Sequence, residues 1–195
     1  LPPPLSNSDN APVQRSFDIH EPTNYLMLFP EGHYEEMTKK NVVLLVIEEF
    51  FREGYINRFY RPLEDRDTMI EYALHIMENL GIRNTNGTVI QKIPYSLLIF
   101  IYLCYTPPMF LVRDNNESRV VGADIILPQL ITELRELNSL DIDNEISVNK
   151  DELNYEILFL LKDILNVRNL DNSEIKAVPD YFLHFIENLP IIKEM

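Results

Sequence analysis

The sequence predicts a single all-α domain, and three observations lead to that prediction. From Tyr34 onward the apolar residues recur at the spacing of an α-helix. No segment alternates between apolar and polar residues for long enough to demand a β-sheet. The 195 residues include only five glycines, and this shortage disfavours turn-rich β architectures.

Composition narrows the classes of protein that remain. Hydrophobic residues make up 46% of the chain, which is enough for a core and excludes wholesale disorder. The 31 acidic and 17 basic residues give a formal charge of −14, which argues against binding to nucleic acid or to an anionic lipid surface. One cysteine excludes a disulfide scaffold and a Cys-rich zinc site.

The chain divides into an arm and one domain. Residues 1–24 are rich in Pro, Ser and Asn and lack a sustained apolar period, so we expect an extended arm. Residues 25–195 are expected to form the all-α domain. We find no secretory signal pattern, and the single cysteine suits the cytoplasm. No repeat of 20–50 residues is visible.

Six helices are expected within this domain. Gly54 and Gly81 close the first two because glycine accepts a positive φ. The third falls in residues 93–112, which carry no charge and are long enough to span a membrane. Pro107 and Pro108 shorten it, so we expect a central helix buried on all sides. The expected helices cover about residues 35–52, 67–80, 93–106, 123–140, 151–167 and 179–189.

Residues with catalytic or metal-binding chemistry are few and scattered. None of His20, His33, His75 and His184 has a second His or a Cys three or four residues away, so no metal site is expected. Cys104 lies in the most apolar segment and is expected to be a core residue. No GxSxG motif is present and no carboxylate pair stands in clearly different environments, so the sequence does not support a hydrolase or a transferase.

The acidic stretch at residues 141–152 allows two interpretations. Its carboxylates fall at positions one, three, five and twelve of a twelve-residue loop, which resembles an EF-hand calcium site. Ile146 stands at the sixth position, where that loop needs glycine for a positive φ, and a β-branched residue is costly there. A solvated acidic connection between two helices is the favoured alternative.

A more consistent pattern lies at residues 119–131, where Gly122, Ala123 and Asp124 begin a helix and Pro128 follows four residues after the aspartate. Asp124, Pro128 and Ile131 share one helix face. Asp124 lies in the first turn, where the helix dipole stabilises its charge. The string resembles the signature helix of the Vps-nine-type guanine-nucleotide exchange domain of Rabex- and Rin-like activators of early-endosomal Rab GTPases.

Four other stretches resemble segments of that family in the same order. They are Tyr55-Ile-Asn-Arg-Phe59-Tyr-Arg-Pro62 followed by Asp65 and Asp67, Tyr72 to Leu80, Ile93-Pro94-Tyr-Ser-Leu-Leu98, and Leu153-Asn-Tyr-Glu-Ile157-Leu-Phe-Leu160. The last expected helix, with Tyr181-Phe-Leu-His184, occupies the place of a Tyr-x-x-Thr segment of the family. The resemblance covers about residues 42–189. It implies a helical bundle packed on a layered helical exchange domain, in one compact unit, that acts on an early-endosomal Rab GTPase and is recruited from the cytoplasm to endosomal membranes.

The resemblance also implies a set of site residues. Asp124 would displace Mg²⁺ and phosphate from the GTPase, and Tyr181 would take the second essential position. Pro128, Ile125, Ile131 and His184 would contact the GTPase. Such exchange stabilises a nucleotide-free intermediate and needs no covalent chemistry, no cofactor and no metal bound to this chain.

Three positions depart from the family pattern. Ile125 stands where a second acid is usual, Thr132 where a tyrosine is common, and His184 where a threonine is expected. The alternative is therefore a Rab-binding domain or a helical protein-interaction scaffold without exchange activity.

Overall fold

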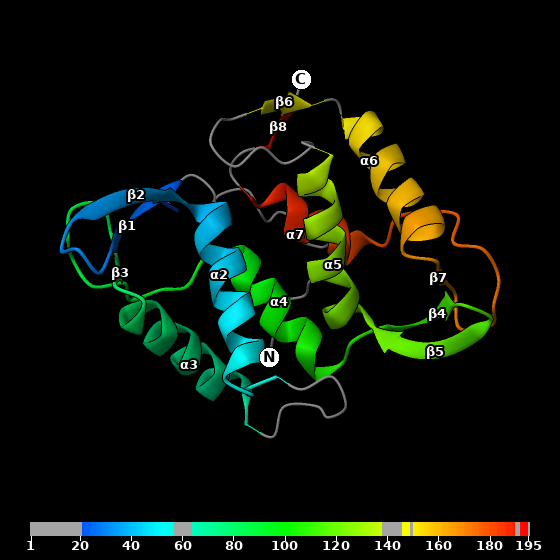
Figure 1. Ribbon diagram of the computed structural model, residues 1–195, viewed down its shortest axis with the longest axis horizontal. Helices are drawn as coiled ribbons and strands as arrows, with labels where there is room; N and C mark the ends of the chain where they lie inside the picture. Colours follow the sequence, from blue (N-terminus) through cyan, green and yellow to red (C-terminus); the bar gives the residue numbers. More distant parts are fainter. Residues whose placement is uncertain (1–20, 57–63, 138–145, 149, 190–191, 195) are drawn as a thin grey trace, which may run out of the picture.

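A computed structural model describes residues 21–56, 64–137, 146–148, 150–189 and 192–194. It shows a mixed α and β fold with two three-stranded antiparallel sheets, one at each end of the molecule in Figure 1. The prediction of an all-α domain is therefore wrong. Of the arm predicted at residues 1–24, residues 1–20 lie outside the described residues, as does half of the acidic stretch, residues 141–145 and 149.

The first half of the fold contains two paired strands, two helices, a short strand and a further helix. In order these are β1 (Asn24–Leu28), β2 (Tyr34–Thr38), α2 (Lys39–Arg52), α3 (Arg66–Asn79), β3 (Ile82–Arg83) and α4 (Tyr95–Tyr105). Strand β1 lies in the middle of its sheet and pairs with both β2 and β3.

The second half repeats this order of elements. It contains β4 (Met109–Asp114), β5 (Glu117–Gly122), α5 (Ala123–Glu136), α6 (Lys150–Phe159), the π-helical turn η2 (Leu160–Ile164), β7 (Val167–Arg168) and α7 (Asp180–Glu187). Strand β4 lies between β5 and β7, as β1 lies between β2 and β3. The second half also has β6 (Ile146–Val148) and β8 (Ile192–Glu194), which form a parallel pair.

Hydrogen bonds show that the two halves are alike in detail. After β3, the Asn84 amide donates to the Thr88 carbonyl (2.9 Å), and the Asn84 side chain donates to the Thr88 hydroxyl (2.9 Å). After β7, Asn169 makes the same two bonds to Ser173, both at 3.0 Å. The fold is therefore built from two copies of one ββααβα unit.

The repeat is visible in the sequence once the structure is known. Residues 82–94 read IRNTNGTVIQKIP and residues 167–179 read VRNLDNSEIKAVP. The repeat length is about 85 residues, which is well beyond the 20–50 residues of common solenoid repeats. A repeat of this length is not visible at those shorter periods. Most matches are conservative replacements, which also hide the repeat.

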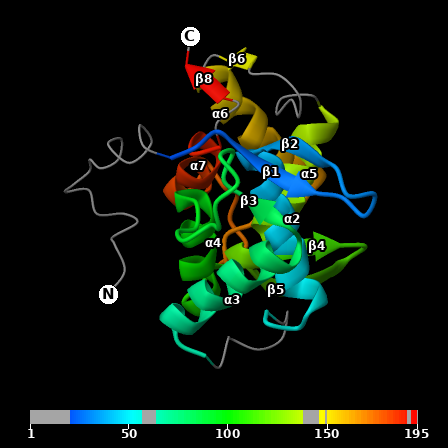
Figure 2. The same cartoon turned by 90° about the vertical axis from the view of Figure 1, so that its left-hand side faces the viewer.

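The two units pack around a central pair of equivalent helices. Helix α4 packs against α7 in the middle of the molecule. Helices α2 and α5 lie side by side in front of this pair in Figure 1 and run antiparallel. Figure 2, turned by 90°, shows α4 and α7 on one side and α2 and α5 on the other. An approximate twofold axis thus relates the units.

A strand replaces the start of one expected helix, at residues 35–38, and another strand follows directly after the third expected helix. Residues 34–38 form β2, and α2 begins only at Lys39. Thr38 is the N-terminal cap of α2, because its side chain accepts a hydrogen bond from the Asn41 amide (3.2 Å). Residues 109–114 belong to β4, since Pro107 and Pro108 end the helical segment. Strand β4 then bonds with β5 and β7.

Helix α4 is short and deeply buried. It covers Tyr95–Tyr105, and Leu97, Ile99, Phe100 and Ile101 have no exposed surface. Burial on all sides was expected, but one face of the helix is only half-buried, the face that carries Tyr95, Leu98, Tyr102 and Tyr105. Among the residues that the structure describes, no helix combines the length and the apolar character that a membrane crossing requires.

Glu21 connects the start of the described chain to α2 and α4, two of the three helices of the first unit. One carboxylate oxygen lies 2.6 Å from the Lys39 ammonium at the start of α2. The other accepts a hydrogen bond from the Tyr95 amide at the start of α4 (2.8 Å). The carboxylate therefore satisfies an amide that the helix itself leaves without a partner.

Candidate functional site

A groove runs between α2 and α5 and has a volume of about 480 Å³. Two elements of the first unit and one of the second form it. The lining residues are Met37, Asn41, Leu44, Leu45, Ile47, Glu48, Phe51, Ile125, Pro128, Gln129, Ile131, Thr132 and Arg135. Most of these side chains are apolar, which makes the groove a candidate binding site.

The two walls of the groove come from equivalent positions of the two units. Helices α2 and α5 both have 14 residues, and each contributes its third, sixth, seventh, ninth, tenth and thirteenth residue. The pairs are Asn41 and Ile125, Leu44 and Pro128, Leu45 and Gln129, Ile47 and Ile131, Glu48 and Thr132, and Phe51 and Arg135. The groove therefore lies on the approximate twofold axis.

Apolar side chains form the floor of the groove. Ile47 and Ile131 are 3% and 1% exposed, so they connect the groove to the core. Phe51 packs edge to face against Phe100 of α4, with ring centroids 6.2 Å apart. The floor of the groove is therefore continuous with the hydrophobic core of the fold.

Pro128 breaks the regular hydrogen bonding of α5 inside the groove wall. It has no amide hydrogen, so the carbonyl of Asp124 receives no bond from it. One turn later, the Thr132 hydroxyl donates to the Pro128 carbonyl (3.1 Å). On the wall that α5 contributes, the apolar ring of Pro128 therefore lies one turn from the Thr132 hydroxyl, which donates its hydrogen bond within the helix.

Asp124 does not line the groove. Its side chain is 8% exposed, and a Cβ added to Gly122 would come within 2.5 Å of the carboxylate and 3.2 Å of Pro107. Its charge also acts on Cys104 of α4. The carboxylate therefore lies at the start of its own helix, beside the end of α4, where the helix dipole stabilises it.

The other two predicted residues outside the groove are on α7. Tyr181 packs edge to face against Phe182, with centroids 4.9 Å apart, and burial raises the pKa of its hydroxyl. The carbonyl of His184 accepts a bond from the Asn188 side chain (2.8 Å). Of the residues that the resemblance singled out, the groove thus brings together Ile125, Pro128 and Ile131 only.

Sequence reasoning missed the α2 wall. Met37, Leu44 and Phe51 lie in segments that the sequence predicted only as part of an amphipathic helix. The internal repeat is the signal that could have found them, because it places α2 at the position equivalent to α5.

The described residues also offer little for metal or thiol chemistry. Among them, no three His, Cys, Asp or Glu side chains gather in a group that could hold a metal ion. Burial raises the pKa of the Cys104 thiol well above its usual value, and the charge of Asp124 raises it further. The thiol donates to the Phe100 carbonyl (3.3 Å), so Cys104 has the character of a core residue.

Comparison with protein-family models, with curated proteins and with solved structures finds no match for this chain. Its function must therefore be inferred from the geometry of the groove.

Proposed function

We propose that this protein is an interaction domain whose α2–α5 groove binds an amphipathic helix of a partner protein. The observation that supports the proposal is the groove itself, which has an apolar floor between two antiparallel helices. A helix laid between them buries its apolar face, which is a common mode of peptide recognition.

The dimensions of the groove fit such an occupant. Its walls run from Asn41 to Phe51 and from Ile125 to Arg135, which corresponds to about 15 Å of helix. A helical occupant would place apolar side chains at positions i, i+3, i+4 and i+7 along that length. The volume of about 480 Å³ lies within the usual range of binding pockets.

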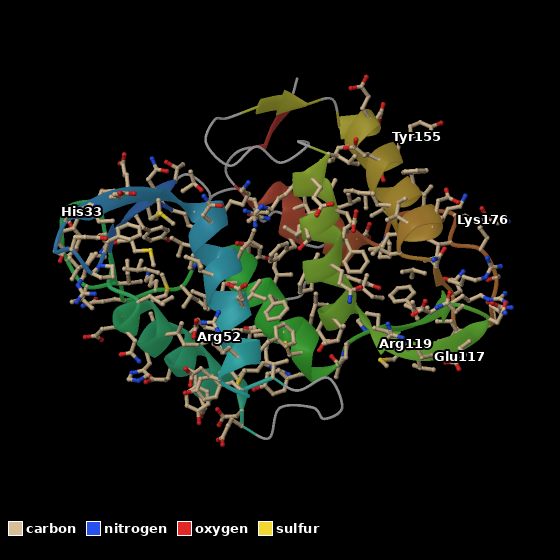
Figure 3. The ribbon with its side chains drawn as sticks, viewed as in Figure 1. His33, Arg52, Glu117, Arg119, Tyr155 and Lys176 are labelled. Carbon is tan, nitrogen blue, oxygen red and sulfur yellow. The ribbon has the colours of Figure 1, made fainter. Side chains whose placement is uncertain are left out.

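The test is binding of a designed helical peptide with leucines at those positions, measured by fluorescence anisotropy against a scrambled peptide of the same composition. Leu44→Asp should weaken binding at least about tenfold, because a buried carboxylate without a partner is costly. Tyr155→Asp on α6 is the matched control, since Tyr155 is 76% exposed and points away from the groove in Figure 3. Equal binding of designed and scrambled peptides would overturn the proposal.

A Rab GTPase is the second candidate partner, favoured by the position of Ile125, Pro128 and Ile131 in the groove. Exchange activity has less support, since Asp124 lies at the start of α5 and not among the groove residues. Exchange activity and recruitment to endosomes stay predictions.

Release of a fluorescent guanine nucleotide from a panel of early-endosomal Rabs tests exchange directly. Exchange through Asp124 predicts that the wild-type protein accelerates release and that Asp124→Ala, checked for folding by circular dichroism, does not. No acceleration of any of these Rabs by the wild-type protein would remove exchange and leave the interaction domain.

A further inference from the structure

The polar residues of the groove are arranged asymmetrically, although its two walls are equivalent. The tenth position of each helix carries Glu48 on α2 and Thr132 on α5. The thirteenth carries Phe51 on α2 and Arg135 on α5. One wall therefore has a single carboxylate and the other a single guanidinium.

The antiparallel helices place these two charges at different levels of the groove. Arg135 lies at the end where α2 begins and α5 finishes. Glu48 lies beyond the midpoint, towards the end of α2 that Arg52 marks in Figure 3. Because the helices are antiparallel, Arg135, the thirteenth residue of α5, lies level with Asn41, the third residue of α2. Glu48 is seven residues farther along α2, so the two charges are separated along the groove by about 10 Å, or two helical turns.

Both charges are open to a partner. Arg135 makes no ion pair with any side chain that the structure describes, although Glu48 has one with Arg52. That pair is 3.9 Å long and both side chains are at least 60% exposed, so it is weak and easily exchanged. The chain carries a net charge of −14, and so a second acidic copy of it is a poor occupant.

We propose, on the basis of the proposed function, that these charges select the sequence and the direction of the bound helix. The occupant has an acidic side chain in its first turn, beside Arg135, and a basic side chain about two turns later, beside Glu48. It then runs parallel to α2. This order also suits the occupant's own helix dipole, which favours acids near the N-terminus and bases near the C-terminus.

Two peptides that share one leucine face test the proposal. The forward peptide has Glu in its first turn and Lys seven residues later, and the reversed peptide has these two residues exchanged. Fluorescence anisotropy should show that the wild-type protein binds the forward peptide about tenfold more tightly. The difference should shrink at high salt, because ions screen exposed charges.

The double variant Glu48→Lys with Arg135→Glu should invert this preference. Equal affinity of the two peptides for the wild-type protein would overturn charge selection and leave the groove as a helix-binding site. A forward preference that persists in the double variant would also overturn it, because other residues would then cause the preference. Failure of both peptides to bind would overturn the proposed function as well.

Discussion

Phe185→Ala is expected to lower the free energy of unfolding by about 3–5 kcal/mol, and Phe100→Ala should cost a similar amount. Neither side chain has any exposed surface. Phe100 is on α4 and Phe185 occupies the equivalent position on α7, the two helices that pack together at the centre of the fold. Each alanine would leave a cavity that the surrounding helices can fill only in part.

Urea denaturation followed by circular dichroism measures both effects. Tyr155→Ala is the control, because its side chain is 76% exposed and such surface changes usually stay within about 0.5 kcal/mol. The central position of α7 would be contradicted if Phe185→Ala lowered the free energy of unfolding by less than about 1 kcal/mol while Phe100→Ala lowered it by the expected amount.

The second large effect is expected at Gly81, which follows α3 with a φ of 77°. Gly81→Ala should cost about 2–3 kcal/mol, because this φ is unfavourable for alanine and the added Cβ meets a tightly packed neighbour. That Cβ would lie 3.0 Å from the Cβ of Leu28 and 3.3 Å from its carbonyl oxygen. The Leu28 amide also donates to the Gly81 carbonyl (3.0 Å), so the strand cannot move away freely.

The second unit provides matched variants for this prediction. Asn166 occupies the equivalent position with a φ of 56°, and its carbonyl accepts from the Arg113 amide at the same distance of 3.0 Å. Gly81→Asn should therefore destabilise less than Gly81→Ala, because asparagine tolerates a positive φ. Asn166→Gly should change stability little. Equal denaturation midpoints for Gly81→Ala and the wild-type protein would show that backbone conformation does not limit this position.

The helices were predictable because their signal is local. The expected helix at residues 67–80 corresponds to α3, and the one at 179–189 corresponds to α7, each within two residues at either end. Asp65 caps α3 by accepting from the Thr68 amide (2.8 Å), so the observed helix begins beside a standard capping residue.

The strands were not predictable from alternation because each is short and has mixed exposure. Residues 34–36 of β2 are all exposed, and β3 and β7 have only two residues each. Such segments form strands because a neighbouring strand supplies hydrogen bonds, and that neighbour can be distant in the sequence. Met27 pairs with Ile82, for example, and Val112 with Val167.

Only one wall of the candidate site was predictable, because a local sequence pattern marks that wall and contacts between distant segments form the other. The string around Asp124 pointed to Ile125, Pro128 and Ile131, which line one wall of the groove. The opposite wall depends on how α2 lies against α5. Asp124 itself, the residue with the most specific expected role, is on the same helix but lies near Gly122 and Pro107 instead.

By itself the sequence determined where the main helices lie and that the chain has a core, because periodicity and composition act over short segments. Only the tertiary structure decided that residues 24–28 and 109–114 form central strands and that two equivalent helices meet in a groove. These features depend on hydrogen bonds and packing between segments far apart in the chain. No local pattern encodes such contacts, although an internal repeat of about 85 residues reflects them.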